Sequence, residues 1–447
     1  MLASRQTRTW FQILQLNGTT KQLVEIVEFL SKLNTHKNRI STEPPQGLFQ
    51  AHGCYCEKKE AKTEKPDTQD LAALAQAMAL KIAIDFNQLT DDFIRALGLD
   101  HTASEIKSIE LNKNEITVID GEAEDIGESQ RVEAYYKPPS QGERRVWIEW
   151  KYYQPKPSGE PNTKERECVE ALAARLKENN PTNQFRVPHC LGYFRDIDQM
   201  GEDRCRFGLV FEKPPGVQPS TQPISLLDLL RDSSTRVEIP SLTDRIKLAL
   251  RIAECIERLH AVNWLHKGLR SSNILFFSNM VADIDFGSLY ISGFDYTYPD
   301  RNDKTIKRSL EHAALDLYRH PAVQGNAGCK MEPASGFKKS YDIYSLGVEI
   351  AYWKPIDEVL GILNPAKVPP STTIQVRRLL LDEKEGYLKH VRSHLGNTVH
   401  GVVKACLEGP PAFGLETGAN ETQEEVGAKL QEQFYEKVVR RLKNMRV

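Results

Sequence analysis

The alternation of hydrophobic and polar positions divides the chain into a helical N-terminal part, a strand-rich part and a long helical part. Apolar residues from Leu23 to Leu33 have the spacing of an amphipathic helix. The polar, proline-containing stretch from Ser41 to Asp70 predicts a linker. A further helix is predicted over residues 70–98, with Asp70 as its N-cap and Gly98 as its end.

Runs of β-branched and aromatic residues follow, and they predict five strands with one inserted helix. The strands are predicted at 116–120, 131–137, 145–151, 190–194 and 206–211, and the helix at about 163–179. Beyond residue 214 the pattern is mostly helical and includes a long buried helix from Leu242 to Leu259. This order predicts an α+β fold with two lobes, a small five-stranded N-lobe and a helical C-lobe, preceded by N-terminal helices.

Composition excludes several classes of partner and site. The net charge of −2 gives no overall attraction to nucleic acid or anionic membranes, so no nucleic-acid partner is expected. No apolar run reaches the roughly 18 to 20 residues of a membrane-spanning helix, so no transmembrane segment is expected. The eight cysteines lack a framework spacing, which is typical of free thiols in a reducing cytosol. We therefore expect a cytoplasmic protein.

A first motif directly follows the long helix, in the segment L-H-K-G-L-R-S-S-N-I-L-F-F (265–277). It resembles the catalytic loop of protein kinases, H-R-D-L-x-x-x-N, with His266 and Asn273 at the histidine and at the metal-binding asparagine. The aspartate that would accept the substrate's proton is replaced by Gly268, which has no side chain for this task. We therefore expect no catalytic residue in this degenerate loop, which comprises His266, Lys267, Gly268, Arg270 and Asn273.

A second motif lies at the right distance, in K-K-S-Y-D-I-Y-S-L-G-V-E-I (338–350). It resembles the start of the kinase helix that anchors the catalytic loop. Asp342 is then expected to be buried and to bond the loop backbone near His266, in a structural role. The two motifs in this order predict a protein-kinase-like fold.

The position of the metal-binding aspartate has two interpretations. In the first, Asp285 of the sequence D-F-G (285–287) binds Mg²⁺ together with Asn273, which lies 12 residues earlier. In the second, the reversed sequence G-F-D that ends at Asp295 stands at this position, and Asp285 lies in an insertion between two strands. We favour the second interpretation because residues 289–291 make the better buried strand.

The nucleotide site is also degenerate. Lys151 resembles the kinase lysine that holds the α- and β-phosphates, although a strand-end lysine reaching solvent is the alternative. Glu170 is its expected ion-pair partner, with Glu167 as the competitor one turn earlier. The loop at 120–130 has no G-x-G-x-x-G and contains four carboxylates, which would repel a triphosphate.

Three segments carry a resemblance to one family, namely W-L-H-K-G-L-R-S-S-N-I-L-F-F, Y-I-S-G-F-D-Y and L-Y-R-H-P-A-V-Q-G. Residues 110–447 look like the kinase-like C-terminal domain of fungal proteins built on a HeLo (prion-inhibition and propagation) domain. The N-terminal T-W-F-Q-I-L and L-V-E-I-V-E-F-L-S-K-L-N are similar to the last helices of a HeLo domain. The resemblance implies a role in non-self recognition or programmed cell death, with a HeLo-domain or immune-receptor-type protein as partner.

These observations predict four segments and a function. Residues 1–40 are a helical fragment resembling the end of a HeLo domain, 41–105 a linker and helix, 106–213 a kinase-like N-lobe and 214–447 a kinase-like C-lobe. The expected function is that of a catalytically inactive interaction or signalling module without a cofactor. The alternatives are a module that binds ATP without hydrolysing it, and an atypical kinase that uses ATP and Mg²⁺.

Overall fold

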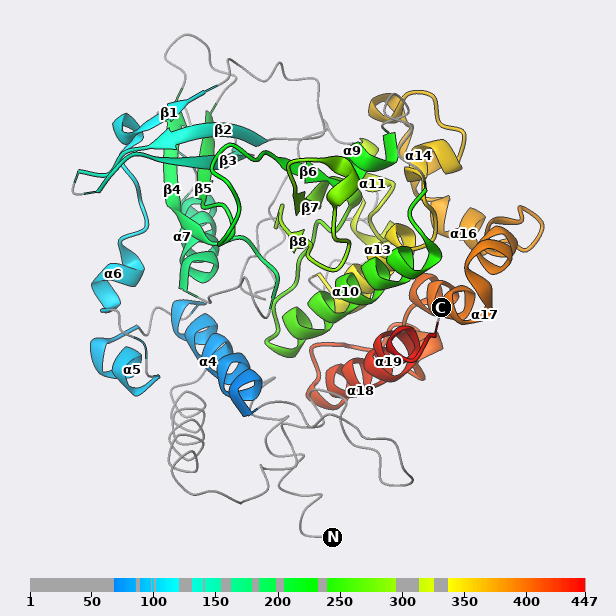
Figure 1. The fold of residues 1–447 in the computed structure, drawn as a ribbon. Coiled ribbons are helices and arrows are strands. Elements are labelled where there is room, and N and C mark those ends of the chain that lie inside the picture. Colours follow the sequence, from blue (N-terminus) through cyan, green and yellow to red (C-terminus); the bar gives the residue numbers. More distant parts are fainter. Residues whose placement is uncertain are drawn as a thin grey trace.

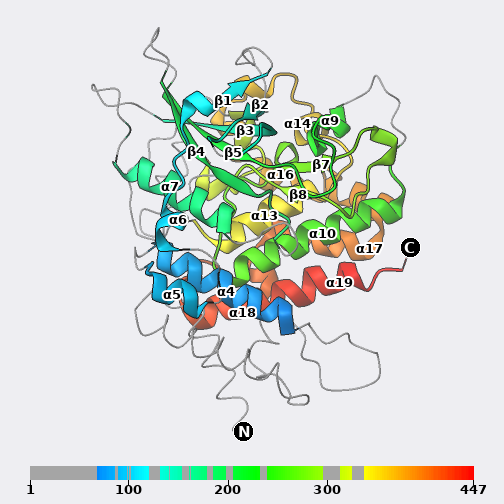
Figure 2. The same ribbon diagram turned by 60° about the vertical axis from the view of Figure 1, so that its left-hand side comes forward.

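The computed structural model describes residues 68–85, 89–97, 99, 102–119, 131–139, 141–153, 161, 163–178, 185–197, 205–231, 239–294, 313–324 and 337–446. It is a mixed α+β structure, with an antiparallel sheet at one end and a helical region at the other (Figures 1 and 2). The helices predicted in residues 1–40, most of the predicted linker and the acidic loop at 120–130 lie outside the described residues.

The sheet has five antiparallel strands, as the sequence predicted. They are β1 (Ile116–Val118), β2 (Arg131–Tyr136), β3 (Arg144–Tyr152), β4 (Cys190–Ile197) and β5 (Cys205–Phe211), in the spatial order β1-β2-β3-β5-β4. The predicted helix between β3 and β4 is α7 (Thr163–Glu178), which packs against β4. Hairpin pairing of β2 with β3, and of β4 with β5, sets the register of the sheet.

Strand β3 is buried on both faces, and its alternation decides which residues face the helical region. Val146, Ile148 and Trp150 belong to a small apolar cluster on one face of the sheet. Trp147 points to the opposite face, where it stacks on Phe211 at 4.5 Å and joins the main core. Because side chains alternate along a strand, Glu149 and Lys151 share the face of Trp147.

Within the described residues, three helices precede the sheet. They are α4 (Thr68–Asp85), α5 (Asp91–Ala96) and α6 (Ala103–Lys107). The single helix predicted over 70–98 is therefore two helices, because Thr90 starts a new one by accepting a hydrogen bond from the N–H of Phe93 at 3.2 Å. Helix α4 packs on α7 and contributes Leu80 and Ala83 to the main core.

The helical region is built around α13 (Lys339–Glu349), all of whose residues are buried. It packs between α10 (Leu242–Ala261) and α17 (Tyr387–Glu408). The contact with α17 requires a glycine, because a Cβ at Gly347 would lie 2.6 Å from the Cβ of Cys406. The other α-helices are α9 (Leu226–Arg231), α11 (Ala313–Asp316), α14 (Ile356–Val359), α15 (Pro370–Thr373), α16 (Val376–Leu381), α18 (Glu424–Phe434) and α19 (Arg440–Lys443).

A second, three-stranded sheet lies beside the helical region. Its strands are β6 (Pro223–Ser225), β7 (Ile274–Phe277) and β8 (Tyr290–Ile291), in that spatial order. Short 3₁₀ turns occur at Lys113–Glu115, Ser271–Asn273 (η2), Val281–Asp283, Pro321–Val323, Pro365–Lys367 and Pro410–Phe413, and a π-helical turn at Tyr435–Val439.

Two further expectations concern cysteines and membranes. The cysteines of the described part, at positions 168, 190, 205, 255 and 406, are buried free thiols, as predicted. Within the described ranges, no helix combines the length and the apolar character needed to span a bilayer.

A buried acid on α10 makes the stability of the fold depend on pH. Glu257 is 4% exposed, and its carboxylate is near the side-chain amide of Gln431, which donates to the Glu257 carbonyl oxygen at 2.7 Å. Burial raises the pKa of the Glu257 carboxyl to about 7. Between pH 4.5 and 7 the unfolded chain therefore releases a proton that the folded chain keeps, so this group destabilises the fold as the pH rises.

We predict that Glu257→Gln removes this pH dependence. The free energy of unfolding of the variant, relative to the native protein, should increase by up to about 3 kcal/mol from pH 4.5 to pH 7.5. Urea unfolding at the two pH values measures the difference. Glu254→Gln on the same helix, where Glu254 pairs with Arg251 nearer the surface, is the control. Parallel pH profiles of Glu257→Gln and the native protein would contradict the expectation.

Candidate functional site

The loop that resembles a catalytic loop is held by one buried carboxylate. Asp342, 1% exposed, accepts hydrogen bonds from the backbone N–H of His266 at 2.8 Å and of Lys267 at 2.9 Å. The side chain of His260 donates to the same carboxylate at 3.1 Å. The contact predicted from the sequence is present. It also stabilises the left-handed backbone of Lys267, whose φ is 64°.

His266 serves as a structural residue of this loop. Its Nδ1 accepts the N–H of Gly268 at 3.2 Å, so Nε2 carries the proton and donates to the Ser292 carbonyl oxygen at 3.0 Å. Burial lowers the pKa of His266 to about 4, which keeps the ring neutral at physiological pH. The ring also packs on Phe294, with centroids 4.4 Å apart. The loop and the segment after β8 are thereby fixed to each other.

Asn273 ends the 3₁₀ turn η2 and is fully engaged by its neighbours. Its amide nitrogen donates to the carbonyl oxygens of Gly268 at 2.7 Å and of Gly293 at 3.3 Å. Its Oδ1 accepts a hydrogen bond from Arg131 at 2.9 Å. Gly293 is required here, because its φ is 70° and a Cβ would lie 2.2 Å from the Cγ of Asn273.

A buried ion pair occupies the junction between the sheet and this loop. Arg131, the first residue of β2, donates through Nε to Glu149 of β3 at 2.8 Å. Its Nη1 donates to the Ser272 carbonyl oxygen at 2.7 Å, and its Nη2 to Asn273. The two side chains are only 9% and 5% exposed. One guanidinium thus joins the five-stranded sheet to the loop at 271–273.

Glu149 completes this network on the other side. It accepts hydrogen bonds from the Ser292 hydroxyl and from the N–H of Gly293, the latter at 3.2 Å. Burial acts to raise the pKa of Glu149, but the charges of Arg131 and Lys151 and its hydrogen bonds outweigh burial and lower the pKa. The carboxylate is therefore ionised and neutralised within the protein.

Arg131 and Glu149 were not predicted as site residues. The available signal was the run V-W-I-E (146–149), which fits the kinase pattern V-A-I-K with glutamate at the position of the lysine. Lys151 lies two residues further on the same face of β3. Its charge lowers the pKa of both Glu149 and His266, so it lies near the network.

Glu170 is engaged elsewhere. On α7 it accepts hydrogen bonds from Arg166, one turn earlier, at 2.9 Å and from the Tyr193 hydroxyl at 3.0 Å. The predicted ion pair with Lys151 is not among the contacts of Glu170 in the described residues. The physical reason is local, because an arginine at i,i+4 on the same helix reaches the carboxylate first. Glu167, the competing residue, is exposed.

Asp285 lies in an exposed turn and binds residues of that turn and of α10. It pairs with Lys247 at 2.5 Å, and it accepts hydrogen bonds from Ser288 and from the N–H of Gly287. The hydrogen bond from Lys247 lowers the pKa of Asp285 to about 2. Asn273 shares none of these contacts, so the structure does not join the two residues as ligands of one ion. Asp295, the other candidate, lies outside the described residues.

At the position of the catalytic base the structure has only backbone. Gly268 contributes its N–H to His266 and its carbonyl oxygen to Asn273. The nearby Arg270 donates to the Ser272 hydroxyl at 2.7 Å. Across the described residues, no three His, Cys, Asp or Glu side chains are grouped so that they could hold a metal ion. The site is an internally satisfied network of polar groups. A comparison with protein-family models found no family that matches the chain.

We predict that the contributions of Arg131 and Glu149 to the stability of the fold are strongly coupled. Arg131→Met should destabilise the fold by about 3–5 kcal/mol, because it leaves the carboxylate of Glu149 buried without its partner. The double variant Arg131→Met/Glu149→Met should lose less than the sum of the two single variants, as chemical unfolding would measure. Arg166→Met removes surface pairs with Glu110 and Glu170 and is the control, with a loss of about 1 kcal/mol or less. Additive losses would contradict the network.

We predict that Asp342 matters to folding. Asp342→Ala leaves the N–H groups of His266 and Lys267 without an acceptor, at a cost of roughly 1–3 kcal/mol. Asp342→Asn keeps one carbonyl oxygen and should be intermediate. Thermal melting compares the three proteins, and an unchanged melting temperature of Asp342→Ala would refute the anchoring role.

Proposed function

We propose that this protein is a catalytically inactive protein-kinase-like module, a pseudokinase, that acts by binding a protein partner. Support for the kinase-like part comes from the order of the elements. A five-stranded antiparallel sheet contains one inserted helix, and a helical region follows in which Asp342 of a buried helix holds the loop of His266. The likeness of the two sequence motifs to those of kinases points the same way.

The observation that carries the proposal of inactivity is the engagement of Asn273 by Arg131. Phosphoryl transfer depends on positioning and on neutralising the phosphates with metal ions and cations. In this network Asn273 gives its side-chain oxygen to a guanidinium instead of a metal. The neighbouring carboxylate, Glu149, is itself neutralised by Arg131. Gly268 supplies no base. Metal binding and proton transfer are therefore each prevented by a specific residue.

The alternative is an atypical ATP-dependent kinase that uses Lys151, Asn273 and Asp285 with Mg²⁺. It requires Arg131 to release Asn273, and Asp285 to leave Lys247 and move toward Asn273. The first step would expose the buried carboxylate of Glu149 without its partner, which costs several kcal/mol. The contacts therefore favour the inactive module.

The family resemblance suggests what the module does. We place it in the cytoplasm, in fungal non-self recognition or programmed cell death, with a HeLo-domain or immune-receptor-type protein as its partner. The buried free thiols fit a reducing compartment. In such a role the kinase-like body offers a rigid surface, and the network around Arg131 keeps that surface in one arrangement without a nucleotide.

We predict that ATP with Mg²⁺ gives neither a thermal shift nor phosphate transfer. A ligand present at 100 times its dissociation constant would stabilise the fold by about 2.7 kcal/mol, which a melting curve resolves. Labelled ATP tests transfer to the protein itself and to generic substrates. Phosphate incorporation that disappears in Lys151→Ala would overturn the proposal. So would a magnesium-dependent thermal shift that Asp285→Ala abolishes.

A further inference from the structure

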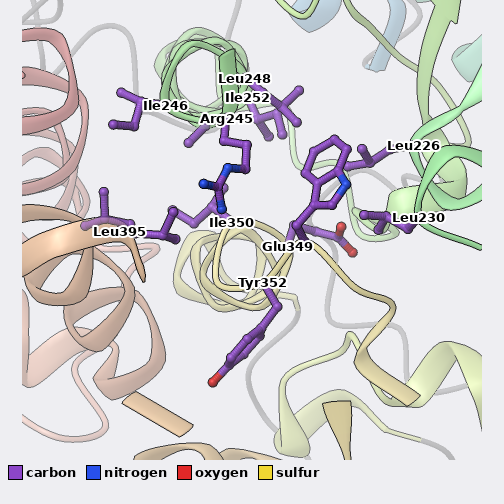
Figure 3. Close-up of a pocket in the computed structure, with 13 residues that line it drawn as sticks. Leu226, Leu230, Arg245, Ile246, Leu248, Ile252, Glu349, Ile350, Tyr352 and Leu395 are labelled. Carbon is purple, nitrogen blue, oxygen red and sulfur yellow. The ribbon is translucent and has the colours of Figure 1, made fainter. Parts of the chain in front are cut away.

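A cavity lies within the helical region and is lined by residues other than those of the network of Arg131 and Glu149. It is enclosed by α9, α10, α13 and α17 and by the segment that follows α13 (Figure 3). Its volume is about 30 Å³, room for roughly two water molecules. The walls are mostly apolar, and they include Leu226, Leu230, Leu248, Ile252, Trp353 and Leu395.

Two polar side chains enter this apolar cavity, and the first is Arg245. It lies in the first turn of α10, and its side chain extends toward α13 and Ile350 (Figure 3). Within the part of the chain that the structure describes, the side chain of Arg245 makes no hydrogen bond and no ion pair, and its Nε is buried without an acceptor. Other cations of α10 are paired, Lys247 with Asp285 and Arg251 with Glu254. A guanidinium that lies unpaired beside an apolar wall would be stabilised by an anion.

The second polar side chain, Glu349, does not supply that anion. Its carboxyl accepts the N–H of Ser271 at 2.8 Å and faces the loop at 271–273 rather than Arg245. Burial raises the pKa of Glu349 to about 8, so the group is largely protonated at neutral pH. The cavity therefore has a net positive charge, carried by Arg245, within aliphatic and aromatic walls. Pockets of this kind bind a ligand through a few polar groups and bury its apolar body.

We propose that the cavity binds a small carboxylate with a short apolar body. The carboxylate pairs with the guanidinium of Arg245, whose planar fork suits two parallel hydrogen bonds. The body lies against Leu230 and Trp353. The volume limits this body to about one or two carbon atoms. This site is separate from the network of Arg131 and Glu149 and does not depend on the proposed function.

Propionate is the probe, and propan-1-ol is the uncharged molecule of matching length. A thermal-shift titration of the full chain should show saturable stabilisation by propionate and none by propan-1-ol at the same concentrations. Arg245→Gln should weaken propionate binding about tenfold or more, the effect of a lost charged hydrogen bond. Because the side chain of Arg245 makes no hydrogen bond or ion pair to lose, this variant should fold like the native protein.

Two further variants make the test specific. Arg251→Gln removes a paired cation from the same helix and should leave propionate binding unchanged. Leu230→Phe fills the cavity and should abolish binding while Arg245 remains in place. Equal stabilisation by propionate and propan-1-ol would overturn the proposal. Undiminished binding to Arg245→Gln would overturn it as well.

Discussion

A guanidinium and a carboxylate, both withdrawn from water, meet where the five-stranded sheet joins the helical region. Removing such a pair from water is costly, and the cost is offset only when the remaining donors and acceptors are also bonded. Arg131 meets this condition with Glu149, Ser272 and Asn273. The interaction thereby fixes β2 and β3 against a loop some 140 residues away in the sequence.

The loop that contains His266 is held in place by its neighbours, although Gly268 gives it no side chain that could act as a base. Asp342 holds the backbone of His266 and Lys267, and the neutral ring of His266 connects the loop to Ser292. None of these contacts depends on the side chain at position 268, so a glycine there leaves the local geometry intact. The anchoring helix α13 is buried along its whole length, so the loop rests on the most constrained element of the helical region.

Arg131 and Arg245 differ in how the structure accommodates their charge. Arg131 is surrounded by acceptors, and its charge is neutralised inside the protein. Arg245 lies beside apolar walls and has no partner in the described structure. The first arginine closes a site to anionic ligands, whereas the second leaves one open. Both sites adjoin the loop at 271–273, through Asn273 in one case and through Glu349 in the other.

The sequence by itself determined the features that depend on local pattern. A run of β-branched and aromatic residues at 145–151 predicted β3, helical periodicity predicted α10, and a spaced motif predicted the contact between Asp342 and the backbone of His266. These signals work because periodicity and short motifs reflect the backbone geometry of a single element. The break between α4 and α5 was missed, because a capping threonine competes only weakly with an apolar helical pattern.

Only the tertiary structure decided the chemistry of the site. Arg131 and Asn273 are 142 residues apart, and no local pattern in one indicates the other. The carboxylate of Glu170 accepts the hydroxyl of Tyr193, which lies on β4, 23 residues away in the sequence. Asp285 lies only 12 residues after Asn273, yet Phe286 packs against Phe276 and Trp353 while Asp285 pairs with Lys247 of α10. Partners of this kind are chosen by packing in three dimensions, because each charge bonds to whichever group the folded chain brings within reach.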